Sequence, residues 1–202
     1  MMNLSRIAPM FLVFATACGD VENPEGEEEN EVITTLVLTF TPVAGGDALE
    51  FSWADVENDG NPVIDDIALS DADDYDVTVS FLNELEDPAE DITLEIQDED
   101  DEHQIFFTGT AVQGPATGTN ASAVVEHAYA DSDADGLPVG LDNTFTTLGT
   151  GSGELTVTLR HLPPENGEAV KVSGLADTVA SDGFGAIGGD NDVQVTFALD
   201  VQ

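Results

Sequence analysis

The sequence predicts a mainly β domain: a single antiparallel, immunoglobulin-like β-sandwich of about eight strands over residues 32–202. Three observations support this fold class. Apolar and polar residues alternate in eight short runs, clusters of Gly, Asp, Asn and Pro separate these runs, and no long stretch shows the 3.6-residue period of a helix. The chain has 202 residues, which suits one such domain behind a short leader segment.

The first two runs predict a hairpin. The segment "PVAGGD" between them supplies a turn rich in glycine. The apolar residues that share a face are Leu36, Leu38 and Phe40 in the first run and Leu49, Phe51 and Trp53 in the second. The other predicted strands lie at 75–81, 105–107, 123–129, 143–148, 155–159 and 193–201.

The segment "DPAEDITLEIQDE" fits two kinds of structure. Asp87 is suited to the N-cap of a helix, Pro88 to its first turn and Glu90 to a capping box. The apolar residues at positions 92, 94 and 96 also alternate as in a strand. We expect a short helix over one end of the sandwich, with a strand as the alternative.

Residues 1–17 have the layout of a secretory signal peptide that ends before Cys18, the only cysteine of the chain. Arg6 precedes an apolar stretch and three small residues. The motif "ATAC" resembles the lipobox of bacterial lipoproteins, with Ala15 where Leu is commoner. The resemblance implies cleavage before Cys18 and lipidation of its sulfur and new amino group, which would anchor the protein firmly in a membrane. The alternatives are an ordinary cleaved signal peptide followed by a coincidental cysteine, or a short uncleaved anchor.

Residues 18–31 are expected to form a disordered acidic tether, because "DVENPEGEEENE" contains almost nothing apolar. The whole chain has 42 acidic residues against three Lys and Arg, a formal net charge of -39. Such a charge excludes nucleic acid and anionic lipid head groups as partners. It indicates a salty or calcium-rich habitat, or simply an exported protein kept soluble by its acidity.

Two acidic loops, "DVENDGNPVIDD" and "DSDADGLPVGLD", have the spacing of a calcium-binding loop. Calcium takes six to eight oxygen ligands, and a glycine at position 6 turns such a loop around the ion. No helical pattern flanks either loop and proline stands at position 8, so we predict a looser calcium loop between strands rather than an EF-hand. The alternative is a pair of simple Asp-Gly turns. The candidate ligands are Asp55, Glu57, Asp59 and Asp66 in the first loop and Asp131, Asp133, Asp135 and Asp142 in the second.

The three histidines, His103, His127 and His161, lie in or beside predicted strands. If they meet on one face they are candidate ligands of a transition metal such as zinc or copper. Hydrogen bonding at strand ends is the alternative, and His127 has the parity of a core residue. No Ser/His/Asp set or nucleophile elbow is identifiable, so the protein is expected not to be an enzyme.

Four stretches, "FLNELEDPAEDIT", "DDEHQIFF", "DSDADGLPVGL" and "GTGSGELTVTLRHLP", resemble those of small bacterial lipoproteins of unknown biochemistry. Such sequences often carry the generic label of a type 1 periplasmic-binding fold. The strand-period patterning predicts against the two α/β lobes of that fold. The resemblance implies a location in the cell envelope and, because some of these lipoproteins are encoded beside outer-membrane receptors, a role in uptake.

These features predict a non-enzymatic binding module that a lipid anchors to the cell envelope, on the surface or periplasmic side of the outer membrane. Calcium is the expected ion, and an outer-membrane receptor is the expected protein partner. The alternative is a structural or adhesive lipoprotein of the envelope.

Overall fold

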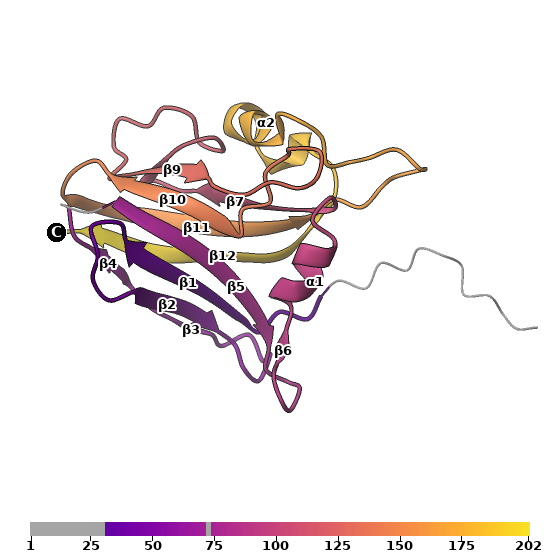
Figure 1. The fold of residues 1–202 in the computed structure, drawn as a ribbon, viewed down its shortest axis with the longest axis horizontal. Coiled ribbons are helices and arrows are strands. Elements are labelled where there is room, and N and C mark those ends of the chain that lie inside the picture. Colours follow the sequence, from indigo (N-terminus) through magenta and orange to yellow (C-terminus); the bar gives the residue numbers. More distant parts are fainter. Residues whose placement is uncertain (1–30, 72–73) are drawn as a thin grey trace, which may run out of the picture.

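The computed structural model describes residues 31–71 and 74–202. The predicted signal peptide, Cys18 and nearly all of the predicted tether lie outside the described residues. Two β-sheets enclose a common hydrophobic core (Figure 1), which confirms the mainly β class with two sheets. No helix in the described part of the chain is both long enough and apolar enough to cross a membrane.

The larger sheet has eight strands: β1 (Thr35–Pro42), β2 (Leu49–Ala54), β3 (Val63–Ile64), β5 (Asp74–Asn83), β6 (Glu90–Asp91), β8 (Val112–Gln113), β9 (Val125–Tyr129) and β10 (Asp142–Thr147). Their order is β3-β2-β1-β5-β10-β9-β8, with β6 paired to β5. The predicted hairpin is present, with Phe40 of β1 opposite Leu49 of β2. This sheet curves like part of a barrel.

The smaller sheet has four strands: β4 (Ile67–Leu69), β7 (His103–Thr108), β11 (Gly151–His161) and β12 (Asp190–Val201). Their order is β4-β12-β11-β7. The long strands β11 and β12 pair antiparallel over almost their whole length.

The main core lies between the two sheets, because every second residue of each long strand points inward. Rings from opposite sheets meet there: Phe107 of β7 and Phe145 of β10 have centroids 5.4 Å apart in an edge-to-face arrangement. A second, smaller cluster forms on the outer face of β7 around Phe106. Both faces of β7 are therefore covered, which buries its residues from His103 to Phe107.

All eight predicted strands are present, and the described chain adds four short ones, β3, β4, β6 and β8. Each of these has only two or three residues, too few for alternation to show in the sequence. Two of the pairings, β4 with β12 and β8 with β9, are parallel, so the prediction of a purely antiparallel sandwich is wrong in this detail. The immunoglobulin-like character of the sandwich stays a prediction.

The predicted short helix is present as α1 (Thr93–Asp98), at one end of the two sheets (Figure 1). Its predicted start at Pro88 is wrong, because Glu90 and Asp91 pair with β5 as strand β6. A second helix, α2 (Leu175–Asp182), and the 3₁₀ turn η1 (Phe184–Ala186) were not predicted. They contribute apolar side chains to the cluster around Phe106.

Candidate metal centre

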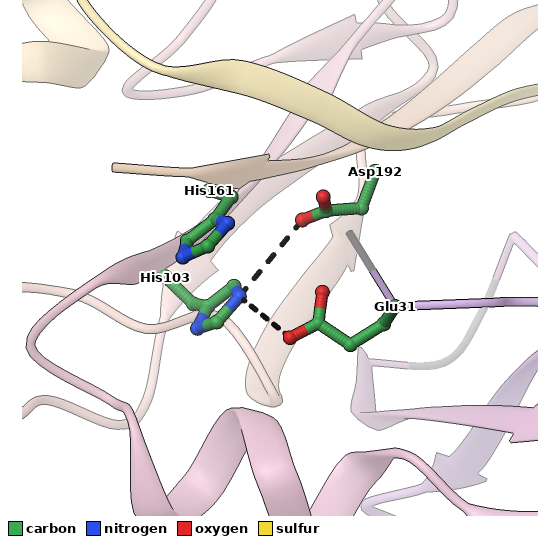
Figure 2. Close-up of side chains that lie close together, drawn as sticks. All are labelled: Glu31, His103, His161 and Asp192. Atoms are coloured by element: carbon green, nitrogen blue, oxygen red, sulfur yellow. Dashed lines mark ion pairs between the residues drawn. The ribbon is translucent and has the colours of Figure 1, made fainter. Parts of the chain in front are cut away.

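Four side chains meet at the end of the sandwich beside α1: Glu31, His103, His161 and Asp192 (Figure 2). Each offers one ligand atom, and these atoms all lie within 4.8 Å of one another. The Nε2 atom of His103 lies 3.6 Å from Oε1 of Glu31 and 3.9 Å from Oδ2 of Asp192. Within residues 31–71 and 74–202, no other group of three or more such side chains converges in this way. We call these four residues the metal centre.

The pairing of β7 with β11 brings the two histidines together. His103 and His161 are direct partners in the register of these strands. Their rings stack with centroids 4.6 Å apart and planes only 6° from parallel. Figure 2 shows both imidazoles on one side of the cluster, with the two carboxylates on the other.

A β-bulge directs Asp192 into the cluster. The register of β11 and β12 is regular as far as the pair Leu159 and Val193, after which Arg160 pairs with Asn191 and Asp192 is left without a partner. Neighbouring residues of a regular strand point to opposite faces, so Asp192 beside the inward Val193 would point outward. A bulge shifts this alternation and re-aims a side chain. The Asp192 side chain is accordingly fully buried, with an exposed fraction of 0%.

Glu31 reaches the cluster from the irregular segment that precedes β1. Backbone pairing of the described chain begins at Thr34, whose N–H donates to the carbonyl of Leu82 at 2.9 Å. Ile33 packs into the main core just before this point. The carboxylate of Glu31 is thus positioned by its ion pair with His103 and by the apolar anchor Ile33, rather than by a strand.

Burial leaves the polar atoms of the metal centre without partners. The exposed fraction of the side chain is 0% for His103, 7% for His161 and 8% for Glu31. No hydrogen bond reaches Nε2 of His103, Oε2 of Glu31 or either carboxylate oxygen of Asp192. Buried polar atoms nearly always have a partner, and leaving one without costs about 1–3 kcal/mol. One cation in the middle would interact with all of these atoms.

The ring of His103 is oriented as in metal-binding histidines. Its Nδ1 lies 3.1 Å from the carbonyl oxygen of Glu99, and a carbonyl can only accept, so Nδ1–H is the donor. The neutral ring therefore directs the lone pair of Nε2 toward the two carboxylates. Metal-ligating histidines commonly donate their other N–H in this way. His161 also has an acidic neighbour, with its Nε2 3.7 Å from the Glu102 carboxylate.

The pKa values show that the metal centre attracts positive charge. Burial and the negative charge of Glu31 raise the pKa of Asp192 to about 6. Burial by itself would lower the pKa of His103, but Glu31, the Glu99 carbonyl and Asp192 outweigh it and raise that pKa. Burial by itself would raise the pKa of Glu31, but the interaction with His103 outweighs it and lowers that pKa. A proton or a metal ion supplies the charge that these groups favour.

The charge and the ligand types of this cluster are compatible with a divalent transition metal. With neutral imidazoles, Glu31 and Asp192 carry two negative charges, and neither pairs with a Lys or Arg within the described residues. Calcium and magnesium take oxygen ligands, whereas zinc binds imidazole and carboxylate together in a tetrahedron. Zinc–ligand bonds of about 2.0–2.2 Å would require the four ligand atoms to move closer by roughly 1 Å.

In the first predicted calcium loop, the first candidate ligand forms hydrogen bonds to the backbone of the loop itself. The buried Asp55 accepts hydrogen bonds from the N–H groups of Asp59 and Gly60 at 3.0 and 2.8 Å. The other three candidates, Glu57, Asp59 and Asp66, are exposed. Calcium binding at this loop stays a prediction.

In the second predicted calcium loop, two of the candidate ligands likewise accept hydrogen bonds from backbone N–H groups. Asp131 accepts hydrogen bonds from the N–H groups of three residues, Gly140, Leu141 and Asp142, while Asp135 and Asp142 expose their side chains. The buried Asp133 accepts from two backbone N–H groups of the loop and forms an ion pair with Lys171 at 2.8 Å. Lys171 thus provides a cation inside the loop. Calcium binding here also stays a prediction.

The third histidine lies apart from the metal centre. His127 packs against the rings of Phe107 and Phe145, and its Nε2 lies 2.9 Å from Oδ1 of Asn143. Burial lowers its pKa to about 4, so it is neutral at neutral pH. The core position predicted from its parity is confirmed, and only His103 and His161 of the three histidines meet.

Sequence reasoning missed the two carboxylates of the metal centre. Glu31 was assigned to the tether, and Asp192 stands in the turn-like segment "GGDND" before the last strand. The two histidines carried a recognisable signal, since both lie at ends of predicted strands. The positions of Asp192 and Glu31 depend on a β-bulge and on contacts between distant segments, and neither produces a recognisable local pattern in the sequence.

The chain matches no protein-family model, no curated protein sequence and no solved structure. The metal centre is therefore assigned from the geometry and chemistry of its own four side chains.

Proposed function

We propose that this protein is a binding module of the cell envelope that holds one divalent transition-metal ion of the zinc type. The observation that supports this most strongly is the convergence of two imidazoles and two carboxylates, all buried, with four of their polar atoms lacking any hydrogen-bond partner. Burying such groups without a cation is unfavourable, and a single divalent ion would satisfy them together.

The geometry favours binding over catalysis. Structural zinc sites use four protein ligands, whereas catalytic sites keep one position open for water or substrate. Here the protein offers four ligands, and their side chains are at most 8% exposed. We therefore propose a structural or carrier role for the ion.

The envelope location in this proposal rests on the sequence. The signal-peptide layout, Cys18 in a lipobox-like motif and the acidic segment after it support a lipid anchor on the outer membrane. A metal-binding module held there would suit an accessory role beside an outer-membrane receptor for uptake. Calcium binding by the two acidic loops remains a separate part of the proposal, with a stabilising role.

Titration calorimetry of the metal-free mature protein tests the metal claim. We expect one zinc ion to bind per chain, with a rise in melting temperature, and to stay bound when calcium is added at millimolar concentration. Calcium is the matched competitor because the acidic loops, and not the metal centre, offer the all-oxygen ligands that it prefers. The claim fails if zinc, cobalt, nickel, iron and manganese produce neither heat nor stabilisation.

Mass spectrometry of the amino-terminal peptide from native membranes tests the location. We expect the mature chain to begin at Cys18 and to carry diacylglycerol and an acylated amino group. A product that begins at Met1, or one with an unmodified thiol, would contradict the anchor and leave the metal claim intact.

A further inference from the structure

We infer that the segment Glu31–Ile33 is the gate of the metal centre: the ion enters and leaves when this segment detaches, while the other three ligands stay in the sheet. A bound ion in turn fixes the start of the domain, where the predicted tether ends. This inference rests on the proposed function, since it concerns the same ion.

Burial makes some movement necessary. The four ligand side chains are between 0% and 8% exposed, so an ion cannot reach them through the closed structure. Glu31 has the most exposed side chain of the four. The question is therefore which ligand moves at the lowest free energy.

Three of the ligands are held by a continuous sheet. His103 and His161 are paired across β7 and β11, and the residues on either side of Asp192 pair with β11. Moving the backbone at any of these ligands would break ladder hydrogen bonds between β7 and β11 or between β11 and β12, at the end of these strands. Opening paired strands costs more free energy than detaching a segment that has no strand pairing.

The fourth ligand is held far more weakly. Within the described chain, backbone pairing begins at Thr34, whose carbonyl also accepts from the N–H of Asp55 at 2.7 Å. Before that point, Val32 is 44% exposed and only Ile33, at 9%, is anchored in the core. Detaching Glu31 therefore requires the loss of one apolar anchor and of the contacts that its carboxylate makes in the metal centre, but of no strand pairing, with a hinge between Ile33 and Thr34.

The kinetics of zinc release test the gate. The zinc-loaded mature protein is mixed with an excess of a chelator, and the release rate is compared between wild type, Ile33→Ala and Val79→Ala. Val79 is the matched control because it is a buried core residue in the middle of β5, where truncation leaves the gate intact. Ile33→Ala should speed release by about thirtyfold or more, which corresponds to about 2 kcal/mol, the low end of the cost of truncating a buried aliphatic side chain to Ala. Val79→Ala should leave the rate within about twofold of wild type, as expected for distant sites.

A milder variant protects the test against loss of folding. Ile33→Val should speed release by a few-fold, in line with about 0.5–1.5 kcal/mol for this change. Equal acceleration by the Ile33 and Val79 variants, or none by either Ile33 variant, would overturn the gate.

Hydrogen exchange provides the second readout. Zinc should slow exchange at the amides of residues 32 and 33, and leave the amides of β10 within the larger sheet unchanged. A zinc-loaded protein whose residues 32 and 33 exchange as fast as in the metal-free form would contradict the gate while leaving metal binding established. A protein that binds no zinc at all would instead contradict the proposed function.

Discussion

The two acidic loops and the metal centre use carboxylates in opposite ways. In the loops the acids are close in sequence, and the buried ones, Asp55 and Asp133, are fixed by hydrogen bonds or by Lys171. In the metal centre the two acids are about 160 positions apart in the chain, and three of their four oxygen atoms have no hydrogen-bond partner. The loops stand out by their spacing in the sequence, whereas the group of unsatisfied ligands depends on pairing between distant segments.

This difference in hydrogen bonding affects how strongly each carboxylate favours a bound cation. A carboxylate that accepts hydrogen bonds from backbone N–H groups is already partly stabilised. A buried carboxylate with no donor favours any available cation, because the charge is otherwise removed from water without compensation. The metal centre differs from the loops because its buried carboxylate oxygens lack hydrogen-bond donors, and not because it has more acidic residues.

The largest expected effect comes from removing one imidazole. His161→Gln should weaken zinc binding about a thousandfold, or about 4 kcal/mol, because a zinc–nitrogen bond is lost in a closed site. The matched loop variant Asp135→Asn should leave zinc affinity unchanged, since this side chain is exposed and outside the centre. Calorimetry on both variants measures the difference. Equal losses in the two would remove the distinction between the loops and the metal centre.

Removing the cation of the second loop should have the next largest effect. Lys171→Met leaves the Asp133 carboxylate buried with no counter-ion, which should lower the free energy of unfolding by about 3.5 kcal/mol. The double variant Lys171→Met/Asp133→Asn should recover much of this loss, because it removes the uncompensated charge. Denaturant unfolding checks both. A rise in melting temperature with calcium in Lys171→Met, absent in wild type, would show that Lys171 occupies the cation position of this loop.

The buried histidine outside the metal centre should make the domain sensitive to acid. Burial lowers the pKa of His127 from 6.5 to about 4, so the unfolded chain takes up a proton first as the pH falls. Its contribution is intact above pH 6.5 and is lost between pH 6.5 and 4, by about 3 kcal/mol. His127→Gln should lack this part of the pH dependence in unfolding measured over that range. An identical pH profile in wild type and variant would contradict the assignment.

Asp192→Asn should have a smaller effect on stability, and it should act in opposite directions on the stability of the metal-free protein and on zinc binding. The pKa of Asp192 is raised from 3.8 to about 6, so its stabilising contribution is complete below pH 3.8 and is lost as the pH rises through 6. At pH 7.5 the neutral amide should therefore stabilise the metal-free protein by about 2 kcal/mol, while zinc binding should weaken. Thermal unfolding with and without zinc measures both signs. A variant less stable than wild type without metal would show that Asp192 serves packing rather than an ion.

Strands were predictable because their signal is local. The eight runs with alternating apolar residues became strands, since a half-buried strand shows its period within a few residues. Helix α2 was missed because it has only eight residues, of which Leu175 and Val179 are buried, and glycines bound it on both sides. The same limit applies to the metal centre. His103 and His161 could be singled out at strand ends, but the bulge at Asp192 and the fold-back of Glu31 depend on tertiary pairing.

Anomalous diffraction at the zinc absorption edge, from crystals of the mature protein grown with stoichiometric zinc, tests the central claim most directly. We expect one strong peak, bonded at about 2.0–2.2 Å to Glu31, His103, His161 and Asp192. A metal centre without a peak, or a zinc ion held by Asp131, Asp133 and their loop instead, would contradict the account.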